Sequence, residues 1–365
     1  MNLALDRATE RMAALGVDAL LVGPGADLRY LVGYHALPLL RLTLLVVRAD
    51  GRHGLVVPRL ERLRAEQSGA GSKVAIHDFG ETDDPFALVA SLLEGIAPEA
   101  TLAAGDRLWA TFLLALQEVR PQARWARASQ VTRELRMRKA PEEVAALRRA
   151  GSAIDRVHAR VPGFLKPGRT EAEVGRDIAD AILDEGHEEV NFVIVASGPN
   201  GASPHHETGS RVLSPGDAVV VDIGGTLGGY CSDCTRNYLV GAVAPESYLE
   251  AHAALEAAQE AACHAVRPGV TAESVDAAAR DLLTEAGYGD AFMHRTGHGI
   301  GLDEHEEPYI VAGNDLVLEP GMAFSVEPGV YLPGRFGMRI EDIVVVTADG
   351  GERLNLLERK AVAVI

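Results

Sequence analysis

The sequence predicts a mixed α/β (α+β) protein built from two domains. The chain has 365 residues, and 47% of them are hydrophobic, which is enough for a large core. A chain of this length is longer than a single domain usually is. Helical patterns alternate with short apolar runs in the first part of the chain, and a long charged helical stretch follows. We therefore expect an N-terminal α/β domain over residues 1–130 and a second domain over residues 131–365.

The N-terminal domain is expected to combine amphipathic helices with short buried strands. The opening segment, MNLALDRATERMAALG, carries its charges at helical spacing among alanines and leucines. Three later runs, DALLVG (18–23), RLTLLVVRA (41–49) and HGLVVP (53–58), are short and apolar, which is typical of strands. The charged stretch 131–159 contains Pro141, a residue well placed to open a helix. It predicts a helical connection into the second domain.

The second domain contains two similar segments. LKPGRTEAEVGRDIADAILDEG (165–186) and VRPGVTAESVDAAARDLLTEAG (266–287) each begin with a basic-Pro-Gly turn. In both, a threonine precedes an amphipathic helix that ends at glycine, the expected capping residues for its two ends. This repetition suggests two related α/β halves that face one another.

Composition excludes several classes of partner. The formal net charge of -17 argues against nucleic-acid and anionic-membrane binding, because both rely on clustered Lys and Arg. No segment reaches the roughly 20 apolar residues of a membrane span, and the charged opening segment is not a secretory signal. Three cysteines cannot form a disulfide framework, so we expect a cytoplasmic protein.

Two carboxylates in VVVDIGGTLGGYCSDCTR (219–236) are the first candidates for chemistry. Asp222 ends a valine run, and Asp233 follows a glycine-rich stretch that can reverse the chain. A reversal near residues 227–229 would bring the two acids within about one residue of cross-strand partners on one face. In an apolar setting such a pair must share a proton or bind cations. The alternative is an exposed hairpin with solvated acids, which the buried character of the valine run disfavours.

Three further polar residues stand beside glycines or at strand ends. His298 lies between two glycines in HRTGHGIGLDEHEEP, Glu327 ends the apolar run in AFSVEPGVY, and Glu341 precedes one in MRIEDIVVVT. With the two aspartates they supply four carboxylates and one imidazole, about the charge that two divalent cations neutralise. Oxygen-rich ligation with one nitrogen suits Mn²⁺, Co²⁺ or Zn²⁺ better than a soft metal.

These motifs resemble the metallopeptidases of the pita-bread fold, in particular their Xaa-Pro branch of prolidases and aminopeptidases P. The resemblance covers most of the chain. It implies a small creatinase-like α/β N-terminal domain followed by a pseudo-symmetric pita-bread catalytic domain. The family's five metal ligands occur in the order Asp, Asp, His, Glu, Glu, and they map onto Asp222, Asp233, His298, Glu327 and Glu341. Two divalent ions per chain are implied, Mn²⁺ with Co²⁺ or Zn²⁺ as alternatives.

The resemblance also assigns catalytic roles. Glu327 would accept the proton of the nucleophilic water, while His205 and His305 would stabilise the tetrahedral intermediate or assist the departing nitrogen. His294 matches another of the family's site histidines, and Arg339 would orient ligand carboxylates.

Other polar residues have simpler interpretations. The remaining histidines singled out are expected at the surface or in helix packing; they are His158, His206, His252 and His264. Cys231 and Cys234 form a C-x-x-C pair, but it lies in a glycine-rich hairpin rather than at a helix start, so we expect packing rather than a redox role.

The expected function is hydrolysis of the Xaa-Pro bond at the N-terminus of proline-containing peptides by a homodimeric, aminopeptidase P-like enzyme. A methionine aminopeptidase would share the ligands, but here about 130 residues precede the catalytic part, which favours the Xaa-Pro branch. A non-catalytic peptide-binding relative would be expected to lack ligands, and none is missing.

One residue bears on the choice between aminopeptidase and dipeptidase. Prolidase-like members commonly carry arginine after the H-E-x-P motif, where it can bind the free carboxylate of a dipeptide by paired hydrogen bonds. This chain reads HEEPYI, with Tyr309 at that position. Tyrosine cannot supply the charge, which favours longer peptides. The alternative is a Xaa-Pro dipeptidase in which Arg335 of PGRFG substitutes.

Overall fold

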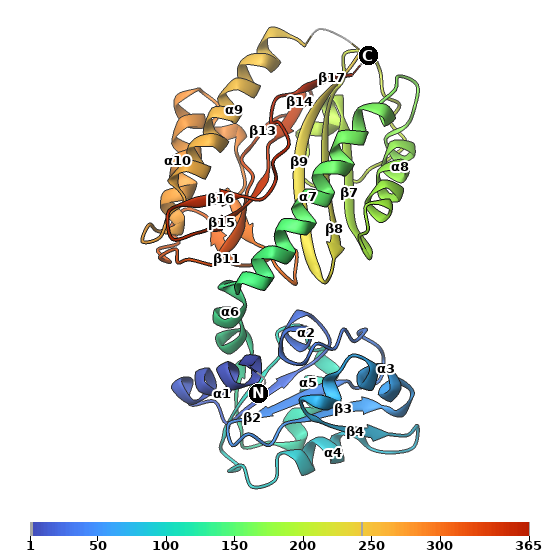
Figure 1. Ribbon diagram of the computed structural model, residues 1–365, viewed down its shortest axis with the longest axis vertical. Helices are drawn as coiled ribbons and strands as arrows, with labels where there is room; N and C mark the ends of the chain where they lie inside the picture. The colour runs from blue at the N-terminus through green and yellow to red at the C-terminus, as the bar shows by residue number, and fades with distance from the viewer. Residues whose placement is uncertain (1–2, 242–243, 365) are drawn as a thin grey trace. The chain divides into compact units, whose positions relative to one another are not determined.

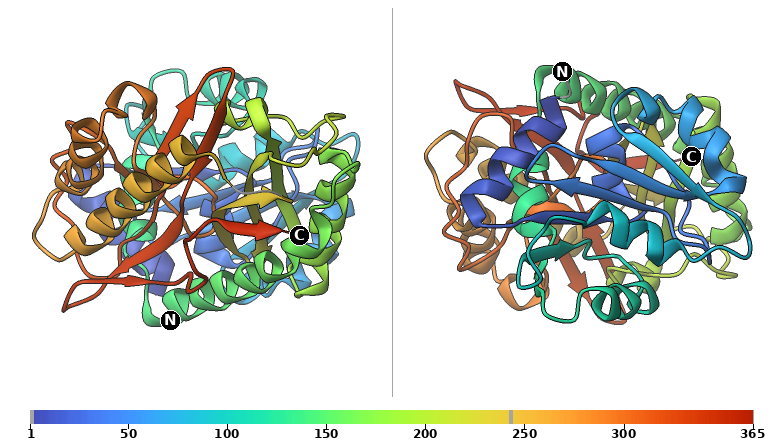
Figure 2. Two further views of the ribbon diagram at one scale, coloured as in Figure 1. Left: turned by 90° about the horizontal axis from the view of Figure 1, so that it is seen from above. Right: turned by 90° about the horizontal axis from the view of Figure 1, so that it is seen from below.

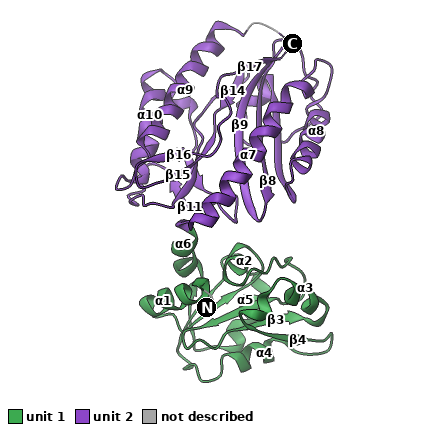
Figure 3. Cartoon of the chain, in the orientation of Figure 1, with its two compact units in different colours: residues 1–136 green, residues 137–365 purple. Residues whose placement is uncertain are grey.

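The computed structural model describes residues 3–241 and 244–364. Contacts divide the chain into two compact units, Met1–Arg136 and Met137–Ile365 (Figure 3). No helix among the described residues is long and apolar enough to cross a membrane.

The first unit contains a six-stranded sheet with the strand order β4-β3-β2-β1-β5-β6 (Figure 1). Strand β1 pairs antiparallel with β2 and parallel with β5, so the sheet is mixed. Its strands are β1 (Ala19–Val22), β2 (Leu44–Arg48), β3 (Gly54–Pro58), β4 (Ala75–Phe79), β5 (Thr101–Ala104) and β6 (Arg124–Arg127). The three strands expected from the sequence in this domain are confirmed as β1, β2 and β3.

Helices cover both faces of this sheet, which explains why its central strands are apolar throughout. Leu20 and Val22 of β1 point into one core and Ala19 and Leu21 into the other. Helices α1, α2, α3 and α6 contribute to the first core, and α4 and α5 to the second. Their bounds are α1 (Leu3–Leu15), α2 (Ala26–Val32), α3 (Arg62–Gln67), α4 (Pro85–Leu92), α5 (Ala110–Val119) and α6 (Ser129–Met137).

The charged stretch after the first sheet forms two helices rather than one. Helix α6 ends at Met137, and α7 (Pro141–Phe164) begins with Pro141 in its first turn. Ala140, directly before Pro141, is extended (φ -68°, ψ 161°), which is the geometry that a following proline favours, and the helix is interrupted at this point.

The second unit holds two main sheets and a hairpin. A four-stranded sheet has the order β17-β9-β8-β7, a five-stranded sheet has the order β11-β10-β12-β15-β16, and β13 pairs with β14. The strands are β7 (Glu189–Ser197), β8 (Ala218–Leu227), β9 (Tyr230–Val240), β10 (Gly297–Gly299), β11 (Glu306–Ile310), β12 (Ala323–Val326), β13 (Gly329–Leu332), β14 (Phe336–Arg339), β15 (Asp342–Val346), β16 (Gly351–Arg353) and β17 (Val362–Val364).

Each main sheet of the second unit has its own pair of helices. Helices α7 and α8 (Glu171–Asp184) share a core with β7, β8 and β9, and α9 (Glu246–Ala265) and α10 (Ala272–Glu285) share another with β12 and β15. Figures 1 and 2 show the sheets between these two helix pairs.

The two similar segments occupy equivalent places in the two halves. Thr170 and Thr271 each stand just before a helix, α8 and α10, and each forms an isolated bridge, to Val212 and Val317 respectively. Only the Thr170 side chain caps its helix, by accepting from the Glu173 N–H at 3.2 Å. The second unit is therefore pseudo-symmetric, and its chemistry-bearing residues lie where the halves meet.

Candidate active site

The hairpin of β8 and β9 places two aspartates on one face. Asp222 lies opposite Thr235, and Asp233 lies opposite Gly224. The two acids are therefore offset by two residues, a diagonal pair on the same face of the hairpin. The sequence-based register, offset by about one residue, was wrong because the strands pair through Leu227 and Tyr230 around the turn. Asp222 and Asp233 are only 8% and 4% exposed, which rules out the solvated alternative.

Glu341 joins these aspartates from the other sheet. It directly precedes β15 and forms an isolated bridge with Thr235 of β9. Its backbone N–H donates to the Thr235 carbonyl at 3.3 Å, and the Thr235 hydroxyl donates to Glu341 Oε2 at 2.7 Å. Thr235 thus fixes both the backbone and one carboxylate oxygen of Glu341.

His298 and Glu327 complete the group. His298 Nε2 lies 3.2 Å from Glu327 Oε1 and 3.7 Å from Asp233 Oδ2. The Ser325 hydroxyl donates to Glu327 Oε1 at 3.0 Å and accepts from the His298 backbone N–H at 3.0 Å. A Cβ on Gly297 would come within 1.8 Å of the Ser325 carbonyl oxygen, so only glycine lets β10 approach β12 closely enough.

The donor set fits divalent cations. One ligand atom from each of Asp233, His298 and Glu341 lies within 4.8 Å of the other two. Asp222 Oδ1 and Glu341 Oε1 are buried, and no described residue donates a hydrogen bond to either oxygen. A buried carboxylate oxygen without a partner is costly, and a hard or borderline cation satisfies it. All five residues expected as ligands lie within or directly beside the strands β8, β9, β10, β12 and β15, in one cluster.

Without a cation the cluster cannot keep all its charges. Burial, together with the neighbouring carboxylates, raises the pKa of Asp233 and of Glu341 well above their usual values. Burial would also raise the pKa of Glu327, but the hydrogen bond and charge of His298 outweigh it and lower that pKa to about 2. Of Asp233, Glu341 and Glu327, it is therefore Glu327 that stays ionised most readily.

Arg339 at the end of β14 connects the cluster to further polar groups. Its Nη2 donates to Asp222 Oδ2, its Nε donates to the Thr235 hydroxyl at 3.1 Å, and its Nη1 donates to the Tyr331 hydroxyl at 2.7 Å. The Tyr331 hydroxyl also lies 2.9 Å from His294 Nε2. This chain joins Asp222 to His294. Tyr331 was missed in the sequence, where a tyrosine in an apolar strand indicates only packing.

The remaining predicted histidines differ in how closely they approach the cluster. The His305 ring centre lies 3.9 Å from that of His298, in an edge-on arrangement. Partial burial and the charge of His298 lower the pKa of His305 to about 4. His205 is exposed, and its charge also acts on His305. The carbonyl of the preceding Pro204 accepts from Arg339 Nη1 at 3.4 Å, which holds this loop beside the site.

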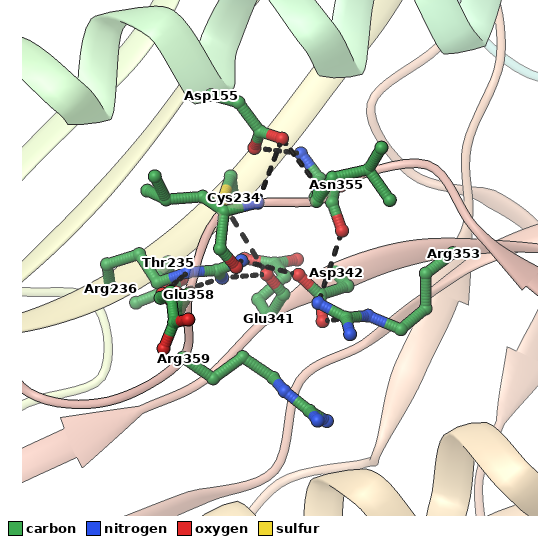
Figure 4. A network of polar contacts seen from close by, with 12 residues as sticks. Asp155, Cys234, Thr235, Arg236, Glu341, Asp342, Arg353, Asn355, Glu358 and Arg359 are labelled. Carbon is green, nitrogen blue, oxygen red and sulfur yellow. Dashed lines mark hydrogen bonds and ion pairs between the residues drawn. The ribbon is translucent and has the colours of Figure 1, made fainter.

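A second network lies on the opposite face of β9 (Figure 4). The buried Arg236 donates to the Glu341 carbonyl at 2.7 Å and pairs with Asp342 Oδ1 at 2.7 Å. Arg353 donates to Asp342 Oδ2 at 2.8 Å. This network holds the backbone of Glu341 in place through its carbonyl group, on the side of β9 opposite to Asp233. It was not found in the sequence, because nothing there pairs Arg236 with a residue more than 100 positions away.

The histidines and cysteines expected at the surface or in packing occupy positions of these two kinds. His158 is buried, with its nitrogens 2.9 Å from the Tyr238 hydroxyl and 3.0 Å from the Cys234 carbonyl oxygen. His252 is buried, His264 is exposed, and His206 pairs with a buried glutamate, Glu171, at 2.8 Å. Cys231 and Cys234 are buried free thiols.

Two arginines bear on the position of Tyr309. The expected substitute, Arg335, donates to the Ser247 hydroxyl at 3.0 Å, and its guanidinium stacks 5.2 Å from the centre of the Phe336 ring. It is Arg295 whose guanidinium carbon lies 4.5 Å from the centre of the Tyr309 ring. Arg295 was overlooked in the sequence, although it stands between His294 and His298.

A buried carboxylate–histidine cluster between two pseudo-symmetric α/β halves defines a metallopeptidase of the pita-bread fold. Residues 145–348 match the family Peptidase_M24 (metallopeptidase family M24), and residues 5–138 match the creatinase/prolidase N-terminal domain. The chain belongs to metallopeptidase family M24, and the fold class expected from the sequence is confirmed.

Similar proteins are known by sequence and by structure. A protein of Mycobacterium tuberculosis named "Probable dipeptidase PepE" is 56% identical over 94% of this chain and 91% of its own length. The "Xaa-Pro dipeptidase" of Lactobacillus helveticus is 35% identical over 95% of both chains. The crystal structure of dipeptidase PepE from Mycobacterium ulcerans is 52% identical, covers 99% of this chain and 97% of its own, and superposes with a TM-score of 0.93. These names favour the dipeptidase alternative over the aminopeptidase preference expected from Tyr309.

Proposed function

We propose that this metallopeptidase is a Xaa-Pro dipeptidase, or prolidase, that uses two divalent cations. The observation that carries the proposal is the cluster of four carboxylates and one imidazole, two of whose buried oxygens lack a donor among the described residues. The names of the relatives support the dipeptide as the substrate class. We assign the creatinase-like domain to residues 1–130 and the catalytic domain to residues 131–365.

We assign the metal-binding role to Asp222, Asp233, His298, Glu327 and Glu341. When bound, the two cations supply an activated water and polarise the scissile carbonyl. Mn²⁺ is the proposed metal, with Co²⁺ or Zn²⁺ as alternatives, since oxygen donors outnumber the single nitrogen.

The protein's own side chains then move the protons and hold the substrate. Glu327 accepts the proton of the attacking water; its carboxylate directly follows β12 and accepts a hydrogen bond from the Ser325 hydroxyl at 3.0 Å. His305 and His205 hydrogen-bond to the oxygen of the tetrahedral intermediate or donate to the departing proline nitrogen. Arg339 holds Asp222 in one orientation.

Aminopeptidase P-like activity is the second candidate, because Tyr309 brings no charge to the position where a dipeptide carboxylate would bind. The expected homodimer and cytoplasmic location are also part of the proposal. The homodimer rests on the family resemblance, and the cytoplasmic location rests on the small number of cysteines.

A substrate screen tests the function. Metal-free protein is reconstituted with Mn²⁺, Co²⁺ or Zn²⁺ and assayed on Xaa-Pro dipeptides, Xaa-Pro-Xaa tripeptides and Xaa-Ala dipeptides. We expect the highest kcat/KM on Xaa-Pro dipeptides. A clear preference for tripeptides would replace the dipeptidase with the aminopeptidase, and no hydrolysis of any prolyl substrate would overturn both.

A further inference from the structure

We propose that Arg295 binds the terminal carboxylate of the Xaa-Pro dipeptide and so determines the preference for dipeptides. The inference rests on the proposed function, and it supplies the cation that Tyr309 lacks. Arg295 comes from the loop before β10 rather than from the segment after H-E-x-P.

The backbone around Arg295 is fixed on both sides. On one side, His294 Nε2 lies 2.9 Å from the Tyr331 hydroxyl. On the other, the buried Asp276 accepts from the Thr296 hydroxyl at 2.7 Å and from the Thr296 N–H at 3.2 Å. The side chain between them therefore starts from an anchored position beside the metal ligand His298.

The guanidinium has an orienting partner but no counter-charge. Its carbon lies 4.5 Å from the centre of the Tyr309 ring, and stacking on an aromatic face leaves the N–H groups at the edge of the guanidinium plane free to donate. No described carboxylate forms an ion pair with Arg295. By contrast, the nearby Arg280 and Arg339 pair with Asp276 and Asp222. The chain has a net charge of -17, yet this half-buried arginine forms no ion pair with a described carboxylate. Its guanidinium can therefore bind an acidic group of the substrate.

The location suits a carboxylate on proline. Arg295 stands three residues before His298, and it stacks on Tyr309 of β11, which stands four residues after His305; the His305 ring centre lies 3.9 Å from that of His298. In the proposed mechanism, His305 assists the departing proline nitrogen. The carboxylate of a dipeptide belongs to that same proline, so its cation must lie on this side of the cluster. A guanidinium held flat can bind both carboxylate oxygens at once.

The test compares an acid with its amide. Wild type, Arg295→Gln and the control Arg335→Gln are assayed on Ala-Pro and on Ala-prolinamide, which lacks the carboxylate. We expect Arg295→Gln to lower kcat/KM for Ala-Pro by about 10- to 100-fold, mainly through KM, and to change the amide less than about threefold. Arg335→Gln should leave the ratio of the two substrates unchanged. Inhibition by L-proline relative to L-prolinamide should weaken in Arg295→Gln alone.

The outcomes separate this inference from the proposed function. A wild type that does not prefer Ala-Pro over the amide overturns the dipeptidase itself. If the wild type prefers Ala-Pro and Arg295→Gln keeps that preference, the role of Arg295 is overturned. An equal loss of kcat/KM on both substrates in Arg295→Gln overturns it as well. If the glutamine variant fails to fold, Arg295→Lys serves instead: it keeps the charge but loses the planar fork, and an intermediate selectivity is expected.

Discussion

Arg339 and Asp222 form a buried ion pair that uses only one of the two carboxylate oxygens. Arg339 Nη2 donates to Oδ2, while Oδ1 receives no hydrogen bond from any described residue. The pair therefore fixes the plane of the carboxylate and leaves one oxygen available to a cation.

Replacing Arg339 with lysine should weaken metal binding. Lysine cannot bond Asp222, Thr235 and Tyr331 together, so Asp222 would lose its fixed orientation. We expect the metal dissociation constant to rise by about 10- to 100-fold, measured by competition with a chelator. The exposed Arg148, which pairs with Glu352, provides the control Arg148→Lys. Equal affinities in both variants would contradict the role given to Arg339.

Removal of metal should abolish activity and lower stability. Cations neutralise carboxylates that otherwise repel one another, so the reconstituted protein should melt at a higher temperature than the metal-free form. The gain is about 2.7 kcal/mol for each bound ion at a free metal concentration of 100 times Kd. Calorimetry measures it, and elemental analysis should find close to two ions per chain. Full activity after thorough removal of metal would contradict the proposed mechanism.

Asp233→Asn should stabilise the metal-free protein. Burial and the neighbouring acids raise the pKa of Asp233 in the folded protein. The protonated side chain therefore contributes stability below the pKa of the unfolded chain, about 4. This contribution is lost as the pH rises through the higher pKa of the folded protein. Asparagine stays neutral, so the free energy of unfolding at pH 8 should increase by about 1 to 3 kcal/mol. The stabilisation by Mn²⁺ should largely disappear. The control is Asp290→Asn, at an exposed position, and urea titration with and without metal makes the measurement.

Glu327→Gln should reduce turnover by orders of magnitude while the fold persists. The amide keeps the shape of the side chain and its hydrogen bond from Ser325, but it cannot take a proton from water. Single-turnover kinetics at equal metal occupancy separate the lost base from lost metal. Near-normal rates in the variant would assign the base to another residue.

The buried His252 should make the protein sensitive to acid. Burial lowers the pKa of His252 to about 4, so the folded state disfavours the charged form and stability falls as pH drops from about 6.5 towards 4. At pH 5 this histidine accounts for about 2 kcal/mol of the loss. His252→Leu should flatten the fall in unfolding free energy between pH 7 and pH 5. His264→Leu, an exposed position on the same helix, should not.

The sequence determined the class of fold and the kinds of donor. Apolar runs and capping residues are local signals, and they located β1, β2, β3 and the two similar helices α8 and α10. The order Asp, Asp, His, Glu, Glu beside valine runs and glycines likewise indicated a metal centre, because acids are rarely placed at buried strand ends without a partner.

Only the tertiary structure decided the relationships between distant residues. The offset of Asp222 from Asp233 depended on how the strands pair around the turn, and the contact of Thr235 with Glu341 depended on two sheets meeting. Arg295 and Tyr309 lie fourteen positions apart, and their stacking follows from the antiparallel pairing of β10 with β11. A local pattern reports how a segment folds, but side-chain partners depend on which segments pack together. For that reason the sequence pointed to Arg335, while the fold turned Arg335 towards Ser247 and placed Arg295 against Tyr309.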